Sequence, residues 1–117
     1  MCNMSTNSTI SVIQKNGSVK SVYCHWDGYT EGVGKDLINH FNTERLANKL
    51  ISEGSISSID KSYVDTYHSK RGEDIEIMQY SSLERFKQSG ESQQFNYLFK
   101  DDEWLVAPES LREFETY

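Results

Sequence analysis

The chain is poor in cysteine and has no long apolar run. Its only two cysteines in 117 residues, Cys2 and Cys24, are too few for a disulfide framework or for a zinc site built from thiolates. No apolar stretch reaches the length of about 20 residues that crosses a bilayer, and the amino-terminal residues lack the pattern of a signal peptide. We therefore expect a protein that stays off the membrane and works in a reducing cytoplasm.

Positive charge is also scarce. Twelve lysines and arginines stand against eighteen aspartates and glutamates, which gives a net charge of −6. Such a protein repels a phosphate backbone, so direct binding of nucleic acid is not expected.

Aromatic residues make up 12% of the chain, which is enough to build one hydrophobic core. We expect a single domain over residues 1–117, in which residues 1–7 are flexible and residues 55–74 form a polar segment rich in loops, with at most a short strand near Tyr63 to Tyr67.

Alternating apolar and polar residues predict a β-hairpin near each end of the chain. In residues 9–24 the alternation runs on both sides of Asn16-Gly17, a strong signal for a two-residue turn. That turn would place Cys24 on one face of the hairpin and four other side chains on the opposite face: Ile10, Val12, Val19 and Tyr23. Residues 95–99 and 104–107 predict the second hairpin, which ends at Pro108. Its large side chains share one face: Phe95, Tyr97, Phe99, Trp104 and Val106.

Apolar residues at helical spacing predict short helices between the hairpins. The first begins after Gly32 and has an apolar stripe of Val33, Leu37, Ile38 and Phe41. The second is capped by Asn42 or Thr43, ends at Gly54 and has a stripe of Leu46, Ala47, Leu50 and Ile51. A third starts in a capping box at Ser81 to Glu84 and carries Leu83 and Phe86. Strands at both ends of the chain, with helices between them, indicate an α+β domain with a mostly antiparallel sheet and helices packed on one face.

The richest chemistry lies in the run Tyr23-Cys24-His25-Trp26-Asp27-Gly28-Tyr29, where the first hairpin ends and a glycine-containing loop begins. Trp26 and Tyr29 offer flat apolar faces with one polar tip each, which suits them to a partner's pocket or to a stacked base. The alternative is that both rings fill the end of the core.

His25 and Asp27 could also act as a general base and its orienting carboxylate, because residues two apart on an extended strand share a side. No nucleophile in a recognised setting adjoins them, so no catalytic residue is assigned. A metal site is not expected either, because the possible ligands lack the spacing of a metal signature: Cys24, His25, Asp27, His40 and His68.

Two cationic positions complete the set of candidate binding residues. The backbone amides of Gly32 and Val33 at the start of the first helix would attract an anion, and Lys35 would add charge, which permits a nucleotide or phosphate ligand. The compact basic patch at Lys70 and Arg71 is either a solvated turn or a contact to an acidic partner surface. The candidate binding residues are therefore Tyr23, His25, Trp26, Asp27, Tyr29, Lys35, Lys70 and Arg71, with no cofactor.

The chain resembles a family of small proteins encoded by bacteriophages and prophages. The resemblance is carried by STISV, SVYCHWDGYTEGVGKDL, GSISSI, KRGED and NYLF with Trp104, and it covers most of residues 5–106. The chain departs from the family pattern at Thr30, where proline is common, and at Asn7, where arginine is common, so we expect a less pre-organised turn. The resemblance implies a viral accessory origin and a small α+β fold, and it assigns no catalytic residue.

Three functions are compatible with these features. The first is non-catalytic binding of a host protein in the host cytoplasm, such as a component of a CRISPR, restriction or nucleotide-signalling defence. The second is binding of a small phosphorylated ligand at residues 23–35, by sequestration or hydrolysis. The third is an acidic mimic of DNA, which would use the carboxylates of Glu73, Asp74, Glu76, Glu84, Glu91, Asp101, Asp102 and Glu103.

Overall fold

A computed structural model gives the structure of residues 6–109 and 111–116. These residues form four α-helices, one π-helical turn and eight strands in a single sheet. The predicted α+β class is confirmed. Of the segment 1–7, which was expected to be flexible, residues 1–5 lie outside the described residues. Asn7 is held in place: its backbone N–H donates to Oε1 of Gln94 (2.8 Å), and its Nδ2 donates to the carbonyl of His25 (2.7 Å).

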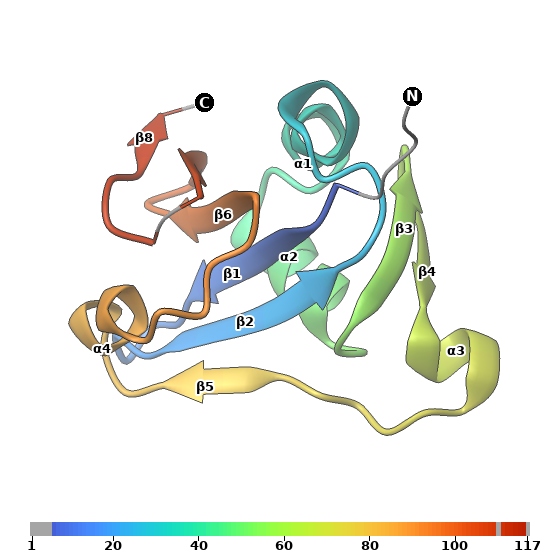
Figure 1. Cartoon of the computed structure of the whole chain (residues 1–117), viewed down its shortest axis with the longest axis horizontal. Helices are drawn as coiled ribbons and strands as arrows, with labels where there is room; N and C mark the ends of the chain where they lie inside the picture. The colour runs from blue at the N-terminus through green and yellow to red at the C-terminus, as the bar shows by residue number, and fades with distance from the viewer. Residues whose placement is uncertain (1–5, 110, 117) are drawn as a thin grey trace.

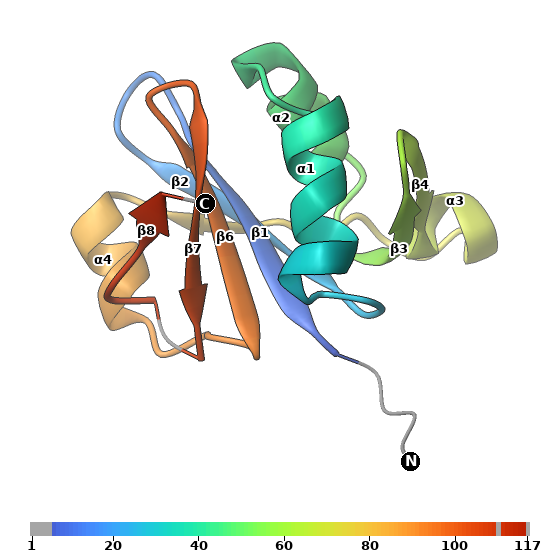
Figure 2. The same ribbon diagram turned by 90° about the horizontal axis from the view of Figure 1, so that it is seen from above.

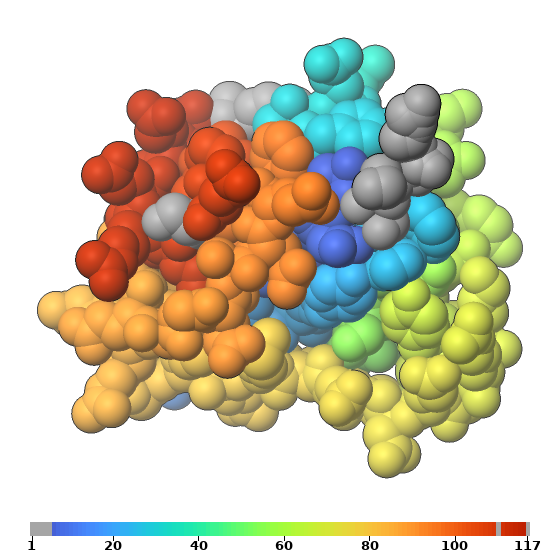
Figure 3. Space-filling model, in the orientation of Figure 1, coloured from blue at the N-terminus to red at the C-terminus, as the bar shows by residue number. Residues whose placement is uncertain are grey.

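The sheet has the strand order β4-β3-β2-β1-β6-β7-β8, with β5 paired to β2 off this path (Figure 1). The strands are β1 (Ser8–Ile13), β2 (Val19–Cys24), β3 (Ile56–Asp60), β4 (Tyr63–Thr66), β5 (Met78–Tyr80), β6 (Phe95–Lys100), β7 (Glu103–Pro108) and β8 (Glu115–Thr116). Two pairings are parallel, β1 with β6 and β2 with β3, and the other pairings are antiparallel. The carboxyl-terminal strands and the β3–β4 hairpin lie on opposite sides of the molecule, with the first two strands visible between them (Figure 3).

Helices cover both faces of this sheet, not one. A π-helical turn, η1 (Thr30–Gly34), runs directly into α1 (Lys35–His40), and α2 (Glu44–Ile51) follows after the cap Thr43. These helices pack on one side of the central strands, while α4 (Leu83–Gln88) packs on the other side (Figure 2). Because side chains alternate along a strand, β6 sends Tyr97 and Phe99 toward α1 and α2 and sends Leu98 toward Phe86 of α4. Each face of the sheet carries apolar side chains, and helices bury them on both sides.

The first hairpin forms where predicted, but its register differs by one residue. Ile10 pairs with Val22 and Ile13 with Val19. The loop has three residues: the N–H of Gly17 donates to the carbonyl of Gln14 (2.9 Å), and Gly17 alone in the turn takes a positive φ, +89°. This is the geometry of a type I turn followed by a left-handed residue. A shift of one residue exchanges the faces, so Cys24 joins Ile10 in the core and Tyr23 points to the other side.

The second hairpin is as predicted. Tyr97 pairs with Val106 and Phe99 with Trp104, so the large side chains share one face of the sheet. The two-residue turn with two positive φ values forms here, at Asp101 (+52°) and Asp102 (+61°).

The segment 55–74, expected to be loop-rich, contains a hairpin and a helix. Strands β3 and β4 pair antiparallel, and α3 (Tyr67–Arg71) follows with Thr66 as its cap. The register shifts between Ile56 and Ser58, so Ile56 and Ile59, which are three residues apart in the sequence, are both buried in the same core. A bulge of this kind destroys the two-residue alternation by which a strand is recognised in a sequence. Within the described residues no helix has the length and apolar character needed to span a membrane.

Candidate functional site

The loop from β2 to η1 forms a corner whose backbone is hydrogen-bonded to three other segments: β3, the residues before β1, and β6. The N–H groups of His25 and Trp26 donate to the carbonyls of Ile56 (2.9 Å) and Ser57 (3.0 Å), which prolongs the pairing of β2 with β3. The N–H of Gly28 donates to the carbonyl of Thr6 (2.8 Å), and its own carbonyl accepts from the buried Tyr97 hydroxyl (2.7 Å). We call residues His25 to Tyr29 the aromatic corner. In Figure 1 it is the cyan loop that leads toward α1.

Two glycines are required here by close approach of the backbone. A Cβ atom at Gly28 would lie 2.8 Å from Cβ of Ser8 and 2.9 Å from the carbonyl carbon of Asn7. A Cβ atom at Gly32 would lie 2.5 Å from the carbonyl oxygen of Asp27. Neither position has room for a side chain. The turn is therefore held by backbone contacts, although it lacks the proline that the resemblance leads one to expect at Thr30.

The two large rings of the corner lie at the surface. Trp26 is 44% exposed and Tyr29 is 42% exposed, so they do not fill the end of the core. The planes of the indole and the His25 ring are nearly perpendicular, with centroids 4.7 Å apart, and the Tyr29 hydroxyl donates to Oδ1 of Asp27 (3.3 Å). Both rings are thus partly oriented by neighbours, while about two-fifths of each side chain remains accessible to a partner.

His25 and Asp27 do not form the base and carboxylate pair considered above. Asp27 has a left-handed φ of +56°, so the chain is no longer extended there and the two side chains do not share a strand face. Nδ1 of His25 instead lies 2.7 Å from the Tyr23 hydroxyl and 3.4 Å from Nδ2 of Asn7. Burial raises the pKa of Tyr23, and the nearby Tyr67 raises it further. The phenol therefore stays protonated and able to donate to the His25 ring.

Cys24 is a core residue. It is fully buried, its thiol donates to the carbonyl of Trp26 (3.8 Å), and burial raises its pKa to about 12. A thiol in this state is neither a nucleophile nor a metal ligand at neutral pH. Among residues 6–109 and 111–116 there is no group of three or more His, Cys, Asp or Glu side chains placed to hold a metal ion.

The anion site expected at the start of the first helix is not available. The N–H of Gly32 donates to the carbonyl of Tyr29 (3.0 Å) and that of Val33 to the carbonyl of Asp27 (2.9 Å), so the loop itself uses the amides assigned to a phosphate. The helix begins as a π-helical turn, and α1 is only six residues long. Lys35 is exposed at its start but has no such amides beside it.

The basic patch lies on α3, and its charge is partly engaged. Arg71 pairs with Glu73 (3.6 Å) and lies over the ring of Tyr67 (5.6 Å to the centroid), while Lys70 is exposed. Two of the candidate binding residues, Arg71 and Tyr23, lie near each other: both line a hollow of about 230 Å³ between β2 and α3. Three carboxylates share that lining: Glu73, Asp74 and Glu76. This hollow is thus more acidic than basic, and Trp26 and Tyr29 do not line it.

Sequence reasoning missed the residues that support the corner and one exposed ring. Thr6, Asn7 and Tyr97 hold the corner by hydrogen bonds, and no short motif marks them. Tyr63, at the start of β4, is 77% exposed, and its ring was assigned no role in binding from the sequence.

Comparison with protein-family models, with curated proteins and with solved structures finds no match for this chain.

Proposed function

We propose that this protein is a non-catalytic binding protein that engages a partner protein through the aromatic corner. One observation carries the proposal: two large aromatic side chains, each more than two-fifths exposed, stand on a loop whose backbone is hydrogen-bonded to three separate segments. Exposed Trp and Tyr side chains are the residues that most often dominate protein interfaces. A loop that is already ordered loses little conformational entropy when it binds.

The contacts of His25 and Asp27 also favour binding over catalysis at this corner. The ring of His25 is engaged by Tyr23 and Asn7, and Asp27 accepts from Tyr29. These contacts orient the side chains around the indole, which is the role of a polar rim at an interface.

The resemblance to bacteriophage and prophage proteins supports a more specific form of the proposal. In that form the partner is a bacterial host protein in the host cytoplasm, such as a component of a CRISPR, restriction or nucleotide-signalling defence, and binding inhibits it. Lys70 and Arg71 would act at the periphery, where charge affects the rate of association more than the affinity.

The other two functions have less support. A nucleotide at the Tyr23 to Lys35 corner would find rings to stack on but would lack the amides of Gly32 and Val33. The acidic residues that would mimic DNA are all exposed, but they are distributed between the α3–β5 connection, the region of α4 and the β6–β7 turn.

The test compares aromatic substitutions at two places on the surface. The tagged protein is used to capture candidate partners from bacterial cells, and the affinity of each purified candidate is then measured for the wild type, Trp26→Ala, Tyr29→Ala and Tyr63→Ala. Tyr63→Ala is the matched control, because this exposed ring lies on β4, outside the corner. We expect each corner variant to weaken binding by about 30-fold, the effect of losing an interface hot spot of about 2 kcal/mol, and the control to bind normally. Undiminished binding by folded Trp26→Ala and Tyr29→Ala proteins would remove the corner from the function.

A further inference from the structure

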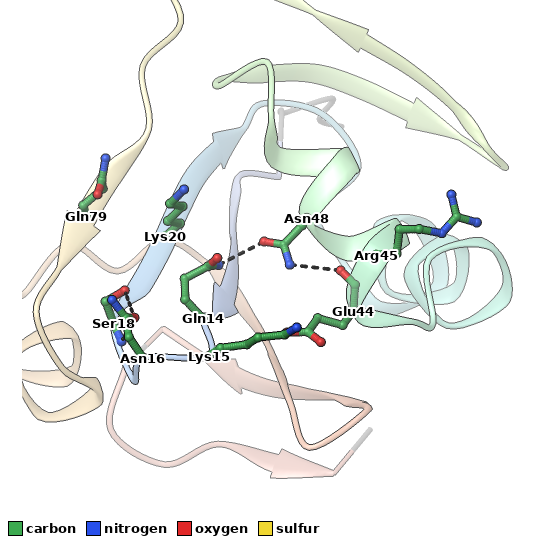
Figure 4. Close-up of a pocket in the computed structure, with 9 residues that line it drawn as sticks. All are labelled: Gln14, Lys15, Asn16, Ser18, Lys20, Glu44, Arg45, Asn48 and Gln79. Carbon is green, nitrogen blue, oxygen red and sulfur yellow. Dashed lines mark hydrogen bonds between the residues drawn. The ribbon is translucent and has the colours of Figure 1, made fainter.

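A polar groove lies at the other end of the first hairpin. It has a volume of about 620 Å³ and lies between the β1–β2 turn, β5 and the start of α2 (Figure 4). Strands β1 and β2 have six residues each, so the groove is roughly 20 Å from the aromatic corner. Figure 2 shows the turn and the corner at opposite ends of the hairpin.

The floor of the groove is fixed by side-chain amides. Nε2 of Gln14 donates to the carbonyl of Val12 (3.1 Å) and to Oδ1 of Asn48 (3.0 Å), and Nδ2 of Asn48 donates to the carbonyl of Glu44 (3.0 Å). Figure 4 shows this chain of bonds crossing from the turn to α2. The turn and the helix are therefore held in a defined relative position before any ligand arrives.

Three cations that form no ion pair with another described residue lie around this floor. Lys15 and Lys20 line the groove, and Arg45 lies at its rim with its guanidinium directed away from the amides (Figure 4). Within the described part of the chain, the ion pairs are those of Arg71 and Lys100, so none of these three cations is in one. A single carboxylate, that of Glu44, shares the lining. A local excess of positive charge is notable in a chain with a net charge of −6.

We propose that this groove binds a small phosphorylated molecule through its phosphate oxygens. Both N–H groups of Gln14 are used within the floor, but the lysine ammonium groups and the amide of Gln79 still have donors to offer. Phosphate oxygens are acceptors only and match such a set, with lysine as a point charge. The volume falls in the range of about 300–1,000 Å³ that is common for small-molecule sites.

The lining of the groove also indicates that the ligand does not need a nucleobase. No aromatic side chain is among the residues that line this groove, so a base would gain nothing from stacking. We expect recognition to depend on the phosphates and to be nearly independent of a nucleobase. This site is separate from the one proposed for a protein partner, and either can fail without the other.

The experiment is a titration followed by two-dimensional NMR and calorimetry, with tripolyphosphate, ATP and ribose 5-phosphate as probes. Tripolyphosphate and ATP are expected to bind with similar affinity and to shift the amide resonances of residues 14–20 and 44–48. Ribose 5-phosphate, with less charge, is expected to bind more weakly at the same place. Shifts confined to other residues, or tighter binding of ATP with shifts at Trp26 and Tyr29, would overturn the proposal.

Substitutions separate a built site from diffuse attraction. Lys15→Gln with Lys20→Gln should weaken tripolyphosphate binding by about ten-fold, since each exposed ion pair contributes up to about a factor of five. Glu44→Gln should tighten it, because the one repelling carboxylate is lost. The control, Lys61→Gln with Lys87→Gln, removes the same charge at positions outside the groove and should leave binding unchanged. Equal weakening by the control, or preference for a single-stranded oligonucleotide over tripolyphosphate at equal charge, would contradict a small-ligand groove.

Discussion

At the scale of single residues, Cys24 and His25 are neighbours in the sequence but have different roles. Cys24 is fully buried, whereas His25 is half-buried and hydrogen-bonded at the edge of the aromatic corner. The register of the first hairpin decides this difference. With the pairing of Ile10 to Val22, even-numbered residues of β2 face α1 and α2, and the thiol becomes part of the core.

Burial of Cys24 makes stability depend on alkaline pH. The pKa of the thiol is raised from 9.0 to about 12 in the folded protein, so above pH 9 the unfolded chain loses a proton that the folded chain keeps. Stability from this group is therefore complete below pH 9 and falls as pH rises toward 12. We expect a loss of about 1.4 kcal/mol in the free energy of unfolding by about pH 10.

The measurement is urea unfolding between about pH 8 and pH 10 in a Cys2→Ser background, with and without Cys24→Ala. The alanine variant is expected to be less stable throughout, because it leaves a small cavity, but to lose less stability with rising pH. Identical pH dependence in the two proteins would show that the thiol does not carry the effect.

At the scale of elements, the first hairpin depends on one residue of its turn. Gly17 takes φ +89° and a Cβ atom there would have nothing within 4 Å. Gly17→Ala should therefore destabilise the protein by about 1 kcal/mol through backbone strain alone, without a clash. Gly17→Asn should cost less, because asparagine tolerates the left-handed region. Thermal or urea unfolding measures both, and equal stability of the alanine variant and the wild type would contradict the three-residue loop.

The elements also show which parts of the fold could be predicted from the sequence. Asn16-Gly17 correctly predicted a hairpin, but the same dipeptide suits a two-residue or a three-residue loop, and only the three-dimensional pairing distinguishes them. The second hairpin was predicted with its faces, because its aromatic alternation is unbroken. Of the β3–β4 hairpin, only a short strand near Tyr63 to Tyr67 was expected, and β3 was missed because a bulge after Ile56 removes the alternation.

The candidate site was predicted in part. The run from Tyr23 to Tyr29 suggested a functional corner, but exposure of Trp26 and Tyr29 depends on hydrogen bonds to the distant carbonyls of Thr6 and Ser57 and from the Tyr97 hydroxyl. The groove near the β1–β2 turn had no sequence signal, since its lysines and amides come from three elements that are far apart along the chain. Long-range pairing, not local pattern, creates both surfaces.

At the scale of the whole molecule, a parallel pairing of β1 with β6 joins the two ends of the chain. A buried polar cluster lies on this junction: the Thr9 hydroxyl donates to Oδ1 of Asn96 (2.9 Å), 87 residues away. Nδ2 of Asn96 donates to the carbonyls of Ala107 (3.0 Å) and Gln93 (3.1 Å). One fully buried carboxamide therefore connects β1, β6 and β7.

Asn96→Ala is expected to lower the free energy of unfolding by about 3 kcal/mol, because it leaves several buried polar groups without their partner. Thr9→Val, which removes a single donor and keeps the side-chain shape, should cost about 1 kcal/mol, and the double variant should cost less than the sum because the two side chains interact. Chemical unfolding followed by fluorescence and by circular dichroism measures all three. If β1 and β6 unfold together, the two signals will share one transition in every variant. Separate transitions, or a loss below about 1 kcal/mol for Asn96→Ala, would mean that this junction does not hold the halves of the sheet as one cooperative unit.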